Sequence, residues 1–257
     1  QIMRSQIDIT MLLQAIRQAG ELCLQYQQKN LSVQIKNDLS PVSEADLAVN
    51  DFINEAIKLN FPQIDIVSEE NNPAANERAR QQKTFFMLDP IDGTKAFIKG
   101  QKQFAISLAH IENNQPMAGI LYLPAYGDIY YNNGQKAYKA DQQEQRTYLN
   151  ITACQAAKTA LISGRFKDQA KLAEYKKKYA IDNIITMSSA MKFCQLLDNK
   201  ANILLGLVPT KEWDLAAANA IINAAEGLMD DLNSERLSYG LRADFNSNLF
   251  IAQSAHN

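Results

Sequence analysis

Asp89-Pro-Ile-Asp-Gly-Thr-Lys95 is the most informative stretch of this chain. The apolar run Thr84–Leu88 leads straight into it and is typical of a buried strand. Two carboxylates, Asp89 and Asp92, therefore follow the carboxyl end of a strand. Gly93 lets a backbone N–H approach an anion closely, and the residues after it predict a short helix whose positive end favours phosphate. The stretch thus predicts a site for hard cations and phosphate.

The composition of the 257 residues is that of an ordinary soluble protein, with 46% hydrophobic and 21% charged residues. The formal net charge of -2 creates no strong field for nucleic acid or for a membrane surface. No stretch approaches the roughly 18 apolar residues of a transmembrane helix. We therefore expect a cytoplasmic protein without a transmembrane segment and without a nucleic-acid partner.

Cysteine and histidine offer little metal-binding or nucleophilic chemistry here. Cys23, Cys154 and Cys194 are widely spaced, so we expect reduced core thiols rather than a disulfide framework or a zinc site. His110 ends an apolar run, and His256 lies next to the terminus. We expect His110 to be structural, which leaves no histidine for a catalytic triad.

Hydrophobic periodicity predicts two lobes, residues 1–148 and 149–257. The first combines helices near 10–28 and 43–59 with strands and an antiparallel meander over 103–139. From about residue 150, strand and helix signals alternate, which indicates a mixed α/β layer. The elements expected in this second lobe are strands at 160–163, 183–187, 202–205 and 227–229 and helices at 168–178, 189–198 and 212–225.

Acids with unusual neighbours occur at four places, and each has an ordinary explanation when taken alone. Asp46 can cap a helix together with Ser43, and Asp92-Gly93 can be a turn. Glu69-Glu70 can be a solvated strand end, and Asp214 can complement a helix dipole. Mg²⁺ prefers oxygen ligands, and a multi-metal site needs carboxylates from several elements, so the four together favour metal binding. Their convergence in space does not follow from the sequence.

The same motifs resemble the lithium-sensitive, magnesium-dependent phosphomonoesterase superfamily typified by inositol monophosphatase. Its D-P-[IL]-D-G-T pattern matches Asp89–Thr94, and its late W-D-x-A-A matches Trp213–Ala217. P-V-[TS]-x-A-D matches Pro41–Asp46, and an upstream Glu-Glu matches Glu69-Glu70. The resemblance implies an α/β (α+β) fold, a layered α-β-α-β-α sandwich of the inositol monophosphatase and fructose-1,6-bisphosphatase type. It also implies about two or three Mg²⁺ ions per site.

Within this superfamily the chain is similar to the CysQ-type 3′(2′),5′-bisphosphate nucleotidases. Asp92–Lys99 and Ser188–Cys194 carry this resemblance, the second after allowance for one extra residue. It implies removal of the 3′-phosphate of 3′-phosphoadenosine 5′-phosphate, in support of sulfur assimilation. Departures at Met187, Phe166 and Gly206 keep an inositol monophosphatase or a broad-specificity sugar phosphatase as the alternative. A catalytically silent regulator that binds phosphorylated ligands is a third hypothesis.

The resemblance further implies a role for each site residue. Asp89 would bridge two ions, and the Asp46 carboxylate would accept the Thr94 hydroxyl proton while Thr94 orients the attacking water. Lys192 would face the 5′-phosphate. The expected metal ligands are Glu69, Asp89, the Ile91 carbonyl, Asp92 and Asp214. The expected catalytic residues are Asp46, Thr94 and Glu69. The expected substrate-binding residues are Glu69, Asp92, Gly93, Thr94, Lys95, Ser189, Lys192 and Asp214.

The expected partner is a small phosphorylated molecule, an adenosine bisphosphate, bound by a monomer or homodimer. Relatives of this kind also suggest a peripheral location on the cytoplasmic face of the inner membrane as an alternative to the free cytoplasm. The resemblance implies inhibition by lithium as well.

Overall fold

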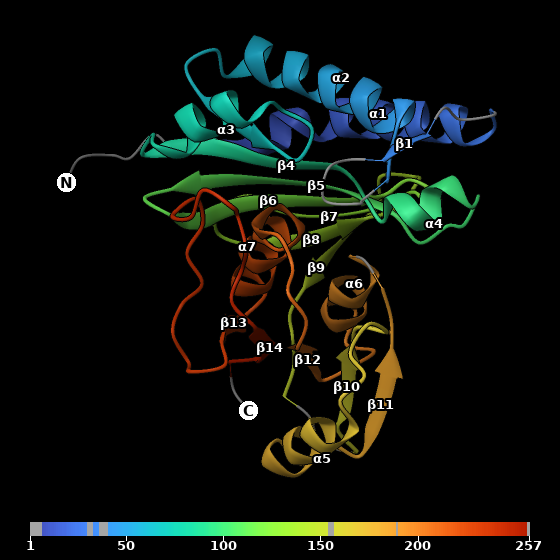
Figure 1. Cartoon of the computed structure of the whole chain (residues 1–257), viewed down its shortest axis with the longest axis vertical. Coiled ribbons are helices and arrows are strands. Elements are labelled where there is room, and N and C mark those ends of the chain that lie inside the picture. The colour runs from blue at the N-terminus through green and yellow to red at the C-terminus, as the bar shows by residue number, and fades with distance from the viewer. Residues whose placement is uncertain (1–6, 30–32, 36–40, 154–156, 189, 256–257) are drawn as a thin grey trace.

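The protein is a stack of helical and sheet layers (Figure 1). The structure, a computed structural model, describes residues 7–29, 33–35, 41–153, 157–188 and 190–255. Helices α1 (Leu13–Gln27) and α2 (Glu44–Asn60) cover one face of a seven-stranded sheet. Between that sheet and a five-stranded sheet lie α6 (Met191–Leu197) and α7 (Ala216–Ala224), and α5 (Gln169–Lys178) covers the outer face of the second sheet. The expected α-β-α-β-α sandwich is confirmed.

The seven-stranded sheet has the order β3-β4-β5-β6-β7-β8-β9, in which β3 and β4 are parallel and every later pair is antiparallel. The meander expected over residues 103–139 is therefore present. The last strand was not predicted, because three of its four residues are exposed and show no apolar alternation. The strands are β3 (Asp65–Ser68), β4 (Thr84–Asp92), β5 (Ala105–Glu112), β6 (Gln115–Leu123), β7 (Asp128–Asn132), β8 (Ala137–Ala140) and β9 (Arg146–Leu149).

Side-chain alternation along β4 determines which way its acids point. Phe86 and Leu88 pack into the cluster beneath α1 and α2, whereas Phe85 and Met87 pack on the opposite face, toward α7. Because successive strand residues point to opposite faces, Asp89 continues the set of Phe85 and Met87. Its carboxylate therefore belongs to the face shared with the second sheet.

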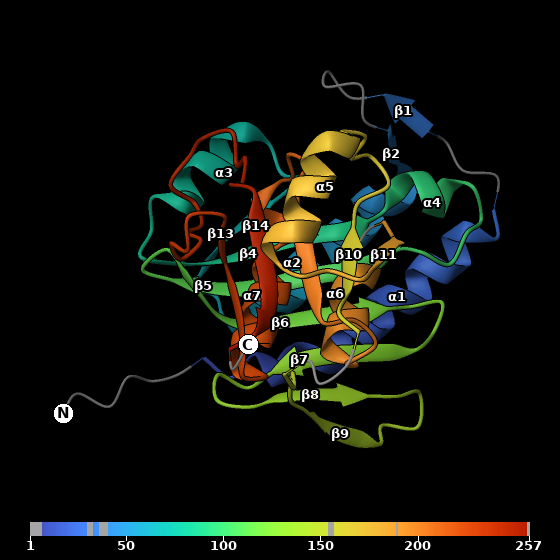
Figure 2. The ribbon, with the colours of Figure 1, turned by 90° about the horizontal axis from the view of Figure 1, so that it is seen from below.

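The five-stranded sheet has the order β11-β10-β12-β14-β13 (Figure 2). Its first three strands run parallel, and β14 pairs antiparallel with both β12 and β13. The sequence did not predict β14, because this strand is short and no clear periodic pattern precedes it. The strands are β10 (Thr159–Ile162), β11 (Asn183–Thr186), β12 (Ile203–Gly206), β13 (Gly227–Asp231) and β14 (Phe250–Ser254).

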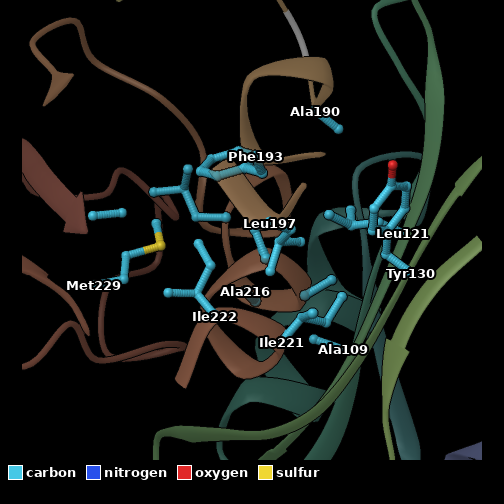
Figure 3. Packing of buried hydrophobic residues seen from close by; sticks show 14 of the residues in the cluster. Ala109, Leu121, Tyr130, Ala190, Phe193, Leu197, Ala216, Ile221, Ile222 and Met229 are labelled. Atoms are coloured by element: carbon cyan, nitrogen blue, oxygen red, sulfur yellow. The ribbon is translucent and has the colours of Figure 1, made fainter. Parts of the chain in front are cut away.

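One hydrophobic cluster joins the facing sides of the two sheets. In Figure 3, Leu197 of α6 lies between Phe193 of the same helix and Leu121 of the first sheet, and Tyr130 and Ile221 of α7 belong to the same cluster. The division of the chain at residue 148 stays a prediction. The shorter described elements are η1 (Ile9–Leu12), β1 (Val33–Ile35), β2 (Pro41–Ser43), α3 (Pro73–Arg80), α4 (Thr94–Ile98) and η2 (Glu212–Asp214).

The two described cysteines and the described histidine are buried side chains. Cys23 and Cys194 are free and buried, in keeping with the expected core thiols, while Cys154 and His256 lie outside the described residues. His110 is buried, and its Nε2 lies 2.8 Å from the Thr84 hydroxyl oxygen. Burial lowers the pKa of His110 to about 4. Among the described residues, no helix has the length and apolar character needed to cross a membrane.

Candidate metal and phosphate site

Three carboxylates from separate parts of the chain meet at one edge of the seven-stranded sheet. Glu69, Asp89 and Asp214 each offer an oxygen, and these oxygens lie within 4.8 Å of one another. Asp89 is buried, whereas Glu69 and Asp214 are half-buried. The described chain thus brings together three of the five expected metal ligands within reach of a single cation.

The pairing of β3 with β4 places Glu69 beside Asp89. The strands are parallel, with Ser68 opposite Leu88, and the Glu69 amide donates to the Leu88 carbonyl at 3.2 Å. The residues that follow each strand therefore emerge side by side at the same edge of the sheet.

Asp214 reaches the cluster from a turn rather than from a helix. The single helix expected over 212–225 is wrong, because η2 (Glu212–Asp214) is a separate 3₁₀ turn that precedes α7. The buried Ser107 hydroxyl donates to the Trp213 carbonyl at 2.9 Å, which holds this turn against β5. Since Ser107 is also the cross-strand partner of Asp89, one hydroxyl links the strand of Asp89 to the turn of Asp214.

Burial and the charges of neighbouring acids both disfavour the ionised form of the clustered carboxyl groups. Burial raises the pKa of Asp89 well above its usual range, and the charges of Glu69 and Asp92 add to this effect. Burial, followed by the charges of Asp92 and Glu69, raises the pKa of Asp214 to about 8, with Lys192 acting in the opposite direction. The donor set of carboxylate oxygens with surplus negative charge fits a divalent cation.

Asp46 and Thr94 form a second, adjoining arrangement. Asp46 is the third residue of α2 and completes a capping box with Ser43, whose backbone N–H and hydroxyl both donate to Asp46 Oδ2. The Thr94 hydroxyl lies 3.1 Å from Asp46 Oδ1 and 3.1 Å from the Ile91 carbonyl oxygen. The cap predicted from the sequence is therefore confirmed, and it leaves Asp46 Oδ1 directed at Thr94.

The sequence model of the inositol monophosphatase family matches residues 5–257. The chain belongs to the inositol monophosphatase family. It is 32% identical over 234 residues to the 3′(2′),5′-bisphosphate nucleotidase CysQ of Salmonella typhimurium, covering 90% of this chain and 94% of that protein. It is 30% identical over 243 residues to the protein of the same name from Aggregatibacter actinomycetemcomitans, covering 93% and 90%.

Structural comparison agrees with this assignment. The crystal structure of CysQ from Bacteroides thetaiotaomicron, a member of the inositol monophosphatase family, has a TM-score of 0.81 at 26% identity and covers 98% of this chain and 99% of that one. As a family member with an acidic group able to hold metal, the chain is a metal-dependent phosphatase.

The remaining residues expected from the family pattern differ in their burial and in their contacts. Asp92 is half-buried and accepts the Ala190 N–H at 2.6 Å, so it connects β4 to the start of α6. Burial lowers the pKa of the Lys192 ammonium, while the charges of Asp92 and Asp214 act in the opposite direction. Lys95 is exposed on α4, and Ser189 lies outside the described residues.

A polar cluster behind Glu69 was missed by sequence reasoning. The Ser68 hydroxyl donates to Asn50 Oδ1 at 2.6 Å, and Asn76 forms hydrogen bonds with both the N–H and the carbonyl of Ser68, at 2.9 and 2.7 Å. All three side chains are buried, so they fix the end of β3 immediately before Glu69. Their separation along the chain left no local signal, because the contacts depend on how α2 and α3 pack against β3.

The structure also shows where the departures from the family pattern lie. A Cβ at Gly206 would overlap the ring of Phe250, so this position on β12 admits no side chain while that ring stays in place. Phe166 packs with the cluster beneath α5 and lines a cavity of about 480 Å³ on the outer face of the second sheet. Met187 is half-buried, and its N–H donates to the Ile162 carbonyl at 2.9 Å.

Proposed function

We propose that this chain is a Mg²⁺-dependent phosphomonoesterase that hydrolyses the 3′-phosphate of 3′-phosphoadenosine 5′-phosphate to give AMP and phosphate. The observation that carries this proposal is the convergence of Glu69, Asp89 and Asp214 within 4.8 Å, beside the 3.1 Å contact between Thr94 and Asp46. The names of the curated relatives support the choice of a nucleotide bearing two phosphates.

The carboxylates would hold the metal. Glu69, Asp89 and Asp214 would supply ligands, with Asp92 and the Ile91 carbonyl as further donors, for about two or three ions. Bound Mg²⁺ supplies positive charge that neutralises the phosphate and lowers the pKa of water at the site. Oxygen donors of this kind suit Mg²⁺ better than softer metals, which prefer nitrogen or sulfur.

Thr94 and Asp46 would move the proton of the attacking water. Two donors from Ser43 contact Asp46 Oδ2, and Oδ1 lies 3.1 Å from the Thr94 hydroxyl, whose hydrogen it would accept. The Ile91 carbonyl competes for that hydrogen at the same distance, and its engagement as a metal ligand would leave Asp46 as the acceptor. The Thr94 oxygen can then accept a proton from water as its own passes to Asp46.

The start of α4 would hold the phosphate that is cleaved. Gly93 caps this helix in a left-handed conformation with φ of 100°, which glycine adopts without strain. Its carbonyl accepts the N–H groups of Ala96 and Phe97, so the helix bonds begin there. The first N–H groups of a helix have no partner within it, and those of Gly93 and Thr94 are therefore suited to phosphate oxygens.

The second phosphate would bind on the α6 side of the site. Lys192 is half-buried. Burial lowers the pKa of its ammonium, and the charges of Asp92 and Asp214 act in the opposite direction. A lysine whose ammonium is influenced by the charges of the proposed metal ligands can bind a phosphate that is not cleaved. Lys95 and Ser189 are the further substrate contacts that we propose.

A substrate panel with Mg²⁺ tests this function. We expect kcat/KM for adenosine 3′,5′-bisphosphate to exceed that for inositol 1-phosphate and fructose 1,6-bisphosphate, and we expect lithium to inhibit. A higher kcat/KM for inositol 1-phosphate would replace the nucleotidase assignment with an inositol monophosphatase. Asp89→Asn should abolish turnover of every substrate, and an active Asp89→Asn enzyme would refute the metal assignment. A cytoplasmic or inner-membrane location and a monomer or homodimer remain predictions.

A further inference from the structure

A cluster of charged side chains lies at the opposite end of α6 from the metal ligands. Asp198 directly follows the helix as its C-cap, and its side chain is only 12% exposed. The Tyr130 hydroxyl lies 3.1 and 3.2 Å from the two Asp198 oxygens, and Oδ2 also receives Lys139 Nζ at 3.3 Å and Lys200 Nζ at 3.1 Å. One carboxylate thus gathers three donors.

Two of these donors come from the seven-stranded sheet. Tyr130 is a buried residue of β7, and Lys139 belongs to β8, where its ammonium also pairs with Asp128 at 2.9 Å. The same ammonium lies 4.9 Å from the centre of the Tyr130 ring. Asp198 therefore ties the carboxyl end of α6 to two neighbouring strands through directed bonds.

Asp198 occupies a position that the helix itself disfavours. The carboxyl end of a helix carries partial negative charge, so an acid there is repelled by the last carbonyl groups. Lys139 and Lys200 compensate this charge. A residue that conflicts with local preference and is compensated by tertiary contacts indicates a requirement beyond helix stability.

The other end of α6 reaches the metal-binding side. The Ala190 N–H donates to Asp92 Oδ2 at 2.6 Å, and Lys192 lies in the first turn. Seven residues at about 1.5 Å each span roughly 10 Å, so the two ends are close enough to move as one body. Figure 3 shows Phe193 and Leu197 of this helix within the central cluster.

Apolar packing alone does not set how α6 is rotated. Hydrophobic contacts are non-directional, whereas hydrogen bonds and ion pairs require particular angles and distances. The bonds of Asp198 to Tyr130 and Lys139 therefore restrict the rotation and axial position of the helix at its far end. A change in the rotation or axial position of α6 would shift the backbone of Lys192, which lies in the first turn of this helix.

We propose that Asp198 is a positioning residue for substrate recognition, acting through α6 on Lys192. It holds the helix against the seven-stranded sheet so that the lysine faces the phosphate that is not cleaved. This inference rests on the proposed role of Lys192 in binding a second phosphate. It predicts that loss of the Asp198 charge weakens recognition of doubly phosphorylated substrates and leaves the chemical step unchanged.

The experiment compares Asp198→Asn with Asp128→Asn. Both changes remove one negative charge from the surroundings of Lys139, and only the first affects α6 directly. With Asp198→Asn we expect KM for adenosine 3′,5′-bisphosphate to rise about tenfold and kcat to change less than about twofold. Kinetic constants for para-nitrophenyl phosphate, which has no second phosphate, should stay unchanged in both variants.

Hydrogen exchange supplies a readout that does not depend on the substrate. In Asp198→Asn the backbone amides of residues 190–194 should exchange at least about tenfold faster than in the unaltered protein, and in Asp128→Asn they should not. Unchanged exchange in Asp198→Asn, or equal acceleration in both variants, overturns the inference. An equal rise in KM for both substrates overturns it as well.

The proposed function and this inference fail in different ways. If the unaltered enzyme prefers inositol 1-phosphate, the nucleotidase assignment fails while the exchange comparison still decides whether Asp198 holds α6. If Asp198→Asn is unfolded at the assay temperature, Tyr130→Phe carries the test, because it removes one donor and keeps every charge. Tyr130→Phe should then raise KM for the bisphosphate selectively, and an unchanged KM refutes the role.

Discussion

Replacing Asp214 with Asn should stabilise the metal-free protein while it abolishes turnover. Asp214, Glu69 and Asp89 offer oxygens within 4.8 Å of one another, and burial followed by the charges of Asp92 and Glu69 raises the pKa of Asp214, with Lys192 acting in the opposite direction. The substitution keeps the shape of the side chain and removes one of the converging charges. Binding of metal should reverse the order of stability, because the variant loses one of the ligands that we propose for the cation.

The expected stability gain of Asp214→Asn follows from the distance between the carboxylate oxygens and from the pKa of Asp214. Two unit charges 4.8 Å apart repel by about 3.5 kcal/mol at an effective dielectric constant of about 20. The pKa of Asp214 rises from 3.8 to about 8, so protonation relieves part of this repulsion at neutral pH. Because the side chain is half-buried and partly screened by water, we expect a gain of about 2 kcal/mol in the free energy of unfolding at pH 8.

The raised pKa of Asp214 also predicts how the free energy of unfolding changes with pH. The folded-state pKa lies above the unfolded value, so the unfolded chain releases its proton first as pH rises. The unfolding free energy contributed by Asp214 is therefore fully present below about pH 4 and is lost progressively toward pH 8. Asparagine does not titrate, so the advantage of Asp214→Asn should be largest near pH 8 and should vanish near pH 4.

Urea unfolding with a chelator at pH 8 and at pH 4.5 measures the difference, and Glu55→Gln on the exposed side of α2 is the matched control. A gain of about 2 kcal/mol corresponds to a rise of roughly 4 to 8 °C in Tm for a chain of this size. Excess Mg²⁺ should raise the Tm of the unaltered protein more than that of the variant. A metal-free Asp214→Asn that is less stable at pH 8, or one that retains turnover, would refute the reasoning.

Three further predictions follow from individual contacts. Thr94→Val should lower kcat about 100-fold while Thr94→Ser stays within about fivefold, since only the hydroxyl contacts Asp46; equal kcat values for both variants would exclude a proton role. Gly206→Ala should lower the urea unfolding free energy by about 1 to 3 kcal/mol because its Cβ meets the Phe250 ring, and a neutral result would contradict that packing. His110, with a pKa near 4, binds protons more weakly when folded, so the unfolding free energy should fall by up to about 3 kcal/mol as pH drops from 6.5 to 4; an NMR titration midpoint above 6 would contradict this.

Local signals succeeded where a residue acts within its own element. The Ser43–Asp46 capping box follows from two side chains three residues apart, and the structure forms it. The strand before Asp89 and the helix beginning at Thr94 follow from the apolar run and from Gly93. These features depend on short-range sterics and hydrogen bonding, which the sequence encodes directly.

Local signals failed where packing overrode periodicity. The helix expected from residue 212 is interrupted before α7 begins, since the Trp213 carbonyl bonds to Ser107, a residue 106 positions earlier. β9 was missed because it contributes backbone pairing and almost no buried side chain. In both cases the decisive partner is distant along the chain and leaves no pattern within a window of neighbouring residues.

The sequence by itself determined which chemical groups are available. It placed Asp89, Asp92 and Gly93 at the end of a strand, and it indicated core positions for Cys23, Cys194 and His110, which are buried in the structure. The tertiary structure alone decided that Glu69 and Asp214 meet Asp89, because parallel pairing of β3 with β4 and the Ser107 bond to the turn of Asp214 are long-range contacts. Convergence of like charges opposes folding locally, so only packing of the whole sandwich can hold them together.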